Sequence, residues 1–193
     1  MTTRSPALRR YRFEGHAIVS ADDRIADSGG GKPDRLNNPA DWARFQAALA
    51  EAALILIGRK SHEADPPTTR QRNRLIVSSS AAGGLEQRAD GWWWNPGAAS
   101  LEDALAAAAP AGGLVAIPGG QRVFDDFLGV GYDAFHLARN PNVTLPGGVG
   151  VFSACERGVS AEDVLSGAGL LPAEYEVLDP AANVTVTVWR PAL

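Results

Sequence analysis

Apolar residues along the chain follow two periods, and together these predict strands that alternate with helices. Apolar runs, typical of strands covered on both faces, occur within 54–58, 74–80 and 113–118, and the second segment ends in three serines. The segment 39–51 repeats apolar side chains at helical spacing, with Trp42 and Phe45 on one face, and starts after a capping residue, Asn38. A last region of alternating apolar and polar residues, 174–190, predicts an antiparallel hairpin.

In chain order, these elements predict an α/β fold. Further strands are expected at 11–20, 91–95 and 134–139, and further helices after Arg59, Ser100 and Gly120. Strands that alternate with helices form a mostly parallel central sheet with helices on both faces, which is a three-layer arrangement. The C-terminal hairpin adds antiparallel strands at one edge. Because no change in composition marks a boundary, we expect a single domain over residues 1–193.

Composition and charge exclude several classes of function. The formal net charge is −4 and the sequence pI is about 5.4, which argues against a nucleic-acid-binding protein. No apolar run approaches the ~18 residues of a membrane span, and the N-terminus lacks the apolar region of a signal peptide. The single cysteine, Cys155, precludes an internal disulfide and reads as a buried structural thiol. We therefore expect a cytoplasmic protein that binds a small molecule, as a monomer or a homodimer.

The motifs for phosphate loops and metal sites are incomplete. The glycine-rich stretch at 28–33 lacks the glycine that should precede it, and Pro33 stands where a serine or threonine would bind a metal. The histidines His16, His62 and His136 are isolated in the sequence from one another and from any cysteine or paired carboxylate. The sequence therefore predicts no metal site.

Asp41 is a carboxylate on the edge of an apolar surface. It is the third residue of the predicted helix, and Phe45 lies one turn further along the same side. An acid in the first turn of a helix is favoured by the helix dipole, and that role alone is physically adequate. The other interpretation is a carboxylate that is placed in a pocket for chemistry.

Three predicted strands end in small residues and hydrogen-bond donors. Gly58 to Ser61 follow one strand, Ser78 to Ser80 end a second, and Gly119 to Arg122 follow a third. In open α/β sheets, ligands bind beyond the carboxyl ends of the strands, and helix N-termini favour phosphates. These segments predict a ligand with several phosphates, such as a dinucleotide, and Arg59 and Lys60 supply the cations that a 2′-phosphate requires.

In their order along the chain, these segments resemble the dihydrofolate reductase family over roughly residues 11 to 190. The similar stretches are AIVSADDRIAD at 17–27, PADWARF at 39–45, LILIGRKS at 54–61, RNRLIVSSS at 72–80 and VAIPGGQRVFDDFL at 115–128. The resemblance implies the dihydrofolate reductase-like fold, NADPH as the cofactor, and reduction of 7,8-dihydrofolate to tetrahydrofolate. It also implies a cis peptide bond between Gly119 and Gly120.

The resemblance further implies which residues form the site. Asp41 stands at the position of the acid that binds the pterin and promotes protonation of its imine nitrogen. The implied substrate-binding residues are Ala17, Trp42, Phe45 and Arg72, the last as the anchor for the glutamate carboxylate of folate. The implied cofactor-binding residues are Ile18, Gly58, Arg59, Lys60, Ser61, Val77, Ser78, Ser79, Gly119, Gly120, Gln121, Arg122 and Val123.

Three departures from the family pattern lie around the pterin. Leu36 stands where the family has a tryptophan, Ala138 where it has the threonine that backs the acid, and Pro118 where it has an aliphatic residue. The cofactor motifs are intact. The sequence therefore supports NADPH binding better than it supports folate specificity.

Two other hypotheses stay open. The chain is also similar to a sister family on the same fold, the pyrimidine reductase domain of riboflavin biosynthesis, in which Asp65, Arg70 and Arg72 would lie near a ribose phosphate. The other hypothesis is a nucleotide-binding protein without turnover, in which Asp41 serves only the helix dipole.

Overall fold

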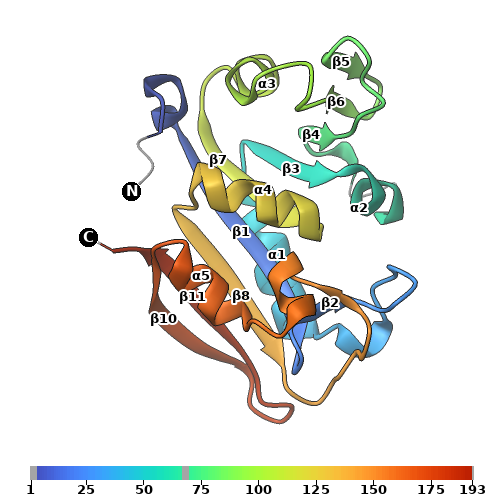
Figure 1. Cartoon of the computed structure of the whole chain (residues 1–193), viewed down its shortest axis with the longest axis vertical. Helices are drawn as coiled ribbons and strands as arrows, with labels where there is room; N and C mark the ends of the chain where they lie inside the picture. Colours follow the sequence, from blue (N-terminus) through green and yellow to red (C-terminus); the bar gives the residue numbers. More distant parts are fainter. Residues whose placement is uncertain (1–3, 67–69, 193) are drawn as a thin grey trace.

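A nine-stranded sheet forms the centre of the protein. The structure, a computed structural model, describes residues 4–66 and 70–192. The strands of the sheet are β1 (Tyr11–Ser20), β3 (Leu54–Gly58), β4 (Arg74–Val77), β5 (Leu85–Arg88), β6 (Gly91–Trp94), β7 (Gly113–Gly119), β8 (Ala134–Asn140), β10 (Leu170–Asp179) and β11 (Val184–Pro191). Their order across the sheet is β10-β11-β8-β1-β7-β3-β4-β6-β5 (Figure 1).

Most of this sheet is parallel, as the sequence predicts. The strands from β8 to β6 in the spatial order run parallel to their neighbours. The predicted C-terminal hairpin, β10 and β11, pairs antiparallel with β8 and forms one edge. The other edge is β5, which pairs antiparallel with β6 and was not expected from the sequence. A second small sheet, also not expected, joins β2 (Arg24–Ala26) to β9 (Val149–Gly150).

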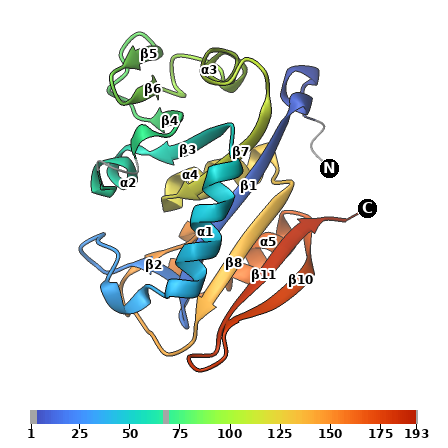
Figure 2. The same ribbon diagram turned by 180° about the vertical axis from the view of Figure 1, so that it is seen from behind.

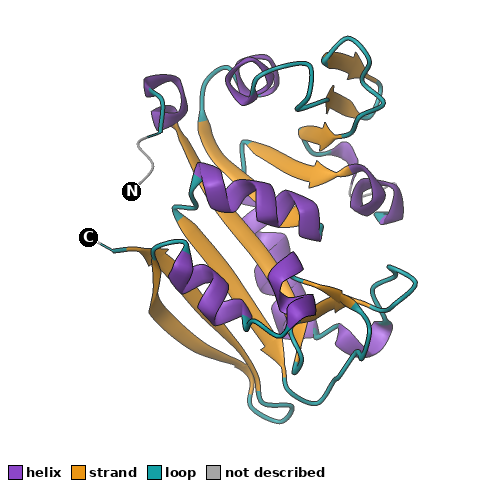
Figure 3. Ribbon diagram, viewed as in Figure 1, coloured by secondary structure: helices purple, strands orange, loops and turns teal. Residues whose placement is uncertain are grey.

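Helices cover both faces of the sheet. They are α1 (Pro39–Glu51), α2 (Arg59–Ala64), α3 (Leu101–Ala108), α4 (Gln121–Val130) and α5 (Ala161–Gly167), with 3-10 turns η1 (Pro6–Arg10), η2 (Asp34–Leu36) and η4 (Ser153–Arg157). In Figure 1 and Figure 3, α4 and α5 lie in front of the sheet, and Figure 2 shows α1 on the opposite face. The three-layer arrangement is therefore confirmed. No helix in the described part of the chain is long and apolar enough to cross a membrane.

The helix starts follow from local capping. The Asn38 side chain accepts hydrogen bonds from the backbone N–H groups of Ala40 and Asp41, and Pro39 occupies the first helical position, where its missing N–H costs nothing. Ser100 caps α3 by accepting from the N–H of Asp103. Helix α5, which the sequence analysis did not predict, has the same device in Ser160.

Two different surfaces of the sheet are buried under these helices. On the α4 face, Phe13, Phe124 and Phe135 are almost fully buried in one aromatic cluster. Alternation along β1 places Glu14 and His16 on the opposite face, beneath α1. Arg44 and Phe45 of α1 contact this face, through His136 and His16 respectively. The layer under α1 therefore contains polar groups where the other layer is apolar.

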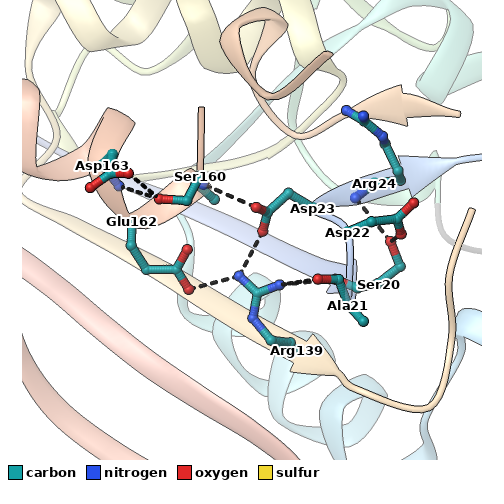
Figure 4. A network of polar contacts seen from close by, with 10 residues as sticks. Ser20, Ala21, Asp22, Asp23, Arg24, Arg139, Ser160, Glu162 and Asp163 are labelled. Carbon is teal, nitrogen blue, oxygen red and sulfur yellow. Dashed lines mark hydrogen bonds and ion pairs between the residues drawn. The ribbon is translucent and has the colours of Figure 1, made fainter. Parts of the chain in front are cut away.

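The long segment after β1 is fastened at its start (Figure 4). Arg139 of β8 donates to the Asp23 carboxylate at 2.6 Å, to the Glu162 carboxylate at 2.7 Å and to the Ser20 carbonyl at 3.0 Å. The other oxygen of Asp23 accepts from the N–H of Ala161, the first residue of α5. This network connects the segment to β8 and α5 before the chain turns toward α1.

Candidate functional site

A cavity of about 760 Å³ lies where the sequence predicts a ligand. Its walls come from α1, from the end of β3 and the start of α2, from the end of β4, and from the turn between β7 and α4. These are the carboxyl ends of parallel strands, where α/β sheets bind ligands. All but two of the predicted site residues line the cavity: Ala17, Ile18, Asp41, Trp42, Phe45, Gly58, Arg59, Lys60, Ser61, Val77, Ser78, Ser79, Gly120, Gln121, Arg122 and Val123.

The two exceptions are Gly119 and Arg72. Gly119 adjoins the lining and has φ of 106°, and a Cβ there would meet the ring of Phe124 at 2.8 Å, so only glycine fits. Arg72 lies outside the cavity, beside a separate hollow of about 280 Å³, and donates to the Gln46 side chain at 3.0 Å. Gln46 does line the main cavity. The structure therefore connects Arg72 to the site only through Gln46.

One end of the cavity suits phosphate groups. The peptide bond between Gly119 and Gly120 is cis, as the resemblance implies, and Gly120 is the N-cap of α4. A Cβ on Gly120 would lie 3.4 Å from the Ser61 hydroxyl, so the backbone of one turn closely approaches the side chain of another. The exposed N-terminus of a ten-residue helix offers N–H groups and a partial positive charge. Arg122 itself points outward, with 93% of its side chain exposed.

Asp41 lies in the wall that α1 contributes. Burial raises the pKa of its carboxyl group, and the positive charges of Lys32 and Arg44 oppose that rise. The pKa of the Lys32 ammonium group is lowered, again by burial first, with Asp41 opposing the shift. Lys32, which the sequence analysis did not single out, comes from the loop before α1 and lines the same cavity.

Two histidines and a glutamate meet beneath α1. His16 of β1 and His136 of β8 are paired in the sheet register, and their rings stack with centroids 4.4 Å apart and planes 3° from parallel. Glu14 lies 3.3 Å from His136 Nε2, and Arg44 Nη2 lies 3.2 Å from His136 Nδ1. The prediction that the histidines are isolated from one another and from carboxylates is therefore wrong, because strands 120 residues apart in the chain are neighbours in the sheet.

The geometry of this cluster suits hydrogen bonding better than a metal ion. Nitrogen and oxygen atoms of Glu14, His16 and His136 lie within 4.8 Å of one another, which a metal could bridge in principle. One ion cannot lie in the planes of two parallel stacked rings, and each imidazole lone pair lies in its own ring plane. A guanidinium can only donate, so Arg44 makes His136 Nδ1 the acceptor and leaves the proton on Nε2, directed at Glu14.

Of the three departures from the family pattern, two line the cavity and one does not. Leu36 is fully buried in a cluster with Ile18 and Ala138 and does not line the cavity. Pro118 and Ala138 do line it. Cys155, predicted as a structural thiol, is the buried residue of η4, and burial raises its pKa.

The three residues that the sister-family hypothesis places near a ribose phosphate do not all line the cavity. Asp65 lines the cavity and forms an ion pair with Arg74 at 2.8 Å. Arg70 and Arg72 lie beside the smaller hollow instead. Arg70 donates to the backbone carbonyl of Asp65 at 2.9 Å, so it supports this turn from outside the cavity.

Several solved structures are similar to this chain. Dihydrofolate reductase from Enterococcus faecalis, complexed with NADP(H) and RAB-propyl, matches with a TM-score of 0.63 and 15% identity, over 93% of this chain and 95% of that chain. A pyrimidine reductase-like protein from Corynebacterium diphtheriae matches with a TM-score of 0.66 and 14% identity, over 100% and 96%. No protein-family model matches the sequence, and no curated protein matches it.

A third similar structure is longer than this chain. It is the diaminohydroxyphosphoribosylaminopyrimidine deaminase/5-amino-6-(5-phosphoribosylamino)uracil reductase from Thermotoga maritima, with a TM-score of 0.63 and 17% identity, over 95% of this chain and 57% of that chain. At such identities the likeness shows the fold. The chain has the dihydrofolate reductase-like fold, as the sequence resemblance implies.

Proposed function

We propose that this chain is an NADPH-dependent reductase that transfers a hydride to a C=N bond of a pterin, with 7,8-dihydrofolate as the first substrate to test. One observation carries the proposal. An acid whose pKa is raised by burial, Asp41, lines the same cavity as three strand ends that present phosphate-binding groups. Similar structures include a dihydrofolate reductase complexed with NADP(H).

The residues at the phosphate end fit such a cofactor. Gly119 and Gly120 have no side chain, and a side chain at either position would crowd Phe124 or Ser61, so their backbone is left uncovered. Helix α4 begins at this point. Arg59, Lys60 and Ser78 line the cavity nearby and would bind the 2′-phosphate. The cofactor, when bound, supplies the hydride.

The chain's own residues would handle the proton and exclude water. Burial raises the pKa of Asp41, and this shift favours the protonated carboxyl group that can donate a hydrogen bond or a proton to a heterocycle. Phe45, Leu49 and Ile57 give the cavity an apolar wall beside this acid. Trp42 lies at the exposed margin, where it can cover one side of a bound ring.

The test is the loss of NADPH absorbance with dihydrofolate as substrate, in the wild type and in Asp41→Asn. We expect turnover by the wild type and a loss of about 10²- to 10⁴-fold in kcat/KM for Asp41→Asn, the range for general acid catalysis. NADPH affinity, followed by quenching of tryptophan fluorescence, should stay within about twofold because Asp41 is on the substrate wall. Full activity of Asp41→Asn would disprove its role.

A ribosylaminopyrimidine of the riboflavin-biosynthesis type is the second candidate substrate. Arg72, the implied anchor for the folate glutamate, does not reach the cavity, and the family tryptophan is replaced by a buried leucine, Leu36. Both observations argue against folate as the substrate, and neither concerns the residues proposed to bind the cofactor. The same assay with this substrate decides between the two. NADPH binding without turnover of either would instead favour the nucleotide-binding protein.

A further inference from the structure

His16 has a buried polar atom without a partner in the wall of the cavity. The residue is 6% exposed and lines the cavity, and its Nε2 has no hydrogen-bond partner among the described residues. Leaving a buried donor or acceptor unpaired is costly, and most such groups in folded proteins are paired. This atom therefore requires an explanation beyond packing.

His16 is held in this position by its neighbours. Its ring stacks on His136, which is itself held between Glu14 at 3.3 Å and Arg44 at 3.2 Å. On the side of α1, Phe45 lies 6.1 Å away between ring centroids, at 54°. The ring cannot leave the stack to find another partner without disturbing these contacts. A group that pairs with Nε2 must therefore come to His16, and it must displace a neighbouring side chain to do so, because the atom has less than 1 Å² of accessible surface.

The charges around the ring favour an oxygen atom as that group. Arg44 and Lys32 line the same cavity and bring two cationic side chains to this region, beside the carboxyl groups of Asp41 and Glu14. Burial lowers the pKa of His16 to about 3, so the imidazole is neutral at ordinary pH and has one N–H to donate. A carbonyl oxygen accepts such a donor, and its partial negative charge is favoured by the two cationic side chains.

We propose that His16 is a specificity-determining residue that donates a hydrogen bond from Nε2 to a carbonyl oxygen of a planar heterocyclic substrate. The substrate would then be bound between two walls, with Asp41 of α1 on one edge and His16 of β1 on another. This inference rests on the proposed reductase function for the identity of the substrate. A site built to hydrogen-bond one substrate group strongly rejects analogues that lack it, because its own polar atom then stays unpaired.

The test compares His16→Phe, which keeps a stackable ring without nitrogens, with His16→Gln, which restores an N–H donor. The probe is uracil, a heterocycle with two carbonyl groups, added to the NADPH-loaded full-length chain. We expect His16→Phe to raise the Tm of the free protein, because the unpaired polar atom is removed, and to weaken uracil binding at least tenfold. His16→Gln should recover most of the affinity, and NADPH affinity should stay unchanged in both variants.

A purely structural histidine would give the opposite pattern. If His16→Phe lowers the Tm and leaves the affinity for uracil unchanged, His16 is a packing residue and the proposal is overturned. In the wild type, uracil should also shift the ¹⁵N resonance of the His16 ring, and no shift at saturating uracil overturns the proposal as well. None of these measurements needs turnover, so they remain decisive if the reductase assay fails.

Discussion

At the scale of single residues, burial in the cavity shifts the pKa values of three ionisable groups toward their neutral forms. Burial is the largest cause of each shift: it raises the pKa of Asp41 and lowers the pKa values of His16 and Lys32. Shifts in this direction favour hydrogen bonding and proton transfer to a bound heterocycle over simple charge pairing. The opposing influence of Lys32 on Asp41 limits the shift, so the acid stays able to ionise.

The same residues predict how stability depends on pH. In the folded protein the pKa of Glu14 is lowered to about 2, chiefly by the hydrogen bond from His136, and burial lowers the pKa of His16 to about 3. The ordinary values are 4.5 and 6.5, so the unfolded chain binds more protons at acidic pH. The contribution of these two groups to the free energy of unfolding is therefore complete above pH 6.5. Below pH 6.5 it falls by at most about 1.4 kcal/mol per pH unit for each proton.

Urea unfolding from about pH 7 to about pH 4 measures this loss. His16→Phe should remove the upper part of the pH dependence, between 6.5 and 4.5, because Glu14 titrates only below that range. Identical profiles for the wild type and His16→Phe would contradict the shift in His16.

Sequence reasoning found one part of the site and missed another for a physical reason. Asp41 and the Gly119-Gly120 turn could be predicted because each belongs to a continuous segment with its own local signal, a helix start or a strand end. His16 and His136 meet only through the register of β1 with β8, and no local spacing encodes that pairing. Lys32 lies in an irregular loop without periodicity, so its position beside Asp41 was also hidden.

At the scale of elements, Arg139 connects β8 and α5 to the start of the loop after β1. Its side chain joins the carboxylates of Asp23 and Glu162 and the carbonyl of Ser20 (Figure 4). Asp23, with 14% of its side chain exposed, also accepts from the N–H at the start of α5. Removing Arg139 would leave a mostly buried carboxylate without its cation.

We expect Arg139→Met to lower the free energy of unfolding by about 2 kcal/mol, the size of hydrogen bonds to charged groups. The matched control is Arg190→Met on the hairpin, since the Arg190–Glu174 pair is 45% and 58% exposed. Surface pairs of this kind contribute about 0–1 kcal/mol. Urea unfolding of both variants measures the difference, and equal losses would show that the network does not fasten the loop.

Most elements with an apolar run, a cap or a turn signal in their own segment could be predicted, including the short helix α2, and elements without such a signal could not. The strands of the parallel sheet and helices α1, α3 and α4 carry apolar runs or capping residues that act locally. The strands β2 and β9 have three and two residues, too few for a visible alternation, and they pair between segments that Asp22, Asp23 and Arg139 hydrogen-bond. Helix α5 has a serine cap but only seven residues, too short for a clear apolar period.

At the scale of the whole molecule, the cavity joins segments that are far apart in the chain. The end of β3, the end of β4 and the start of α4 each contribute to its walls. A ligand that binds all three stabilises the folded chain by mass action, by about 2.7 kcal/mol at a concentration 100 times its Kd. We therefore expect NADPH to raise the Tm in proportion to the logarithm of its concentration.

The choice between cofactors should follow from the same walls. NADH lacks the 2′-phosphate that Arg59 and Lys60 would bind, so at equal concentration it should raise the Tm by less than NADPH does. Lys60→Ala should reduce the difference between the Tm increases that the two cofactors cause, because it should weaken the binding of NADPH and not that of NADH. Asp41→Asn should keep the full NADPH shift, because Asp41 is on the α1 wall and not at the strand ends proposed to bind the cofactor. If NADH and NADPH raise the Tm of the wild type equally, Arg59 and Lys60 do not bind a 2′-phosphate. If neither raises the Tm, the chain does not bind a dinucleotide and the proposed function is wrong.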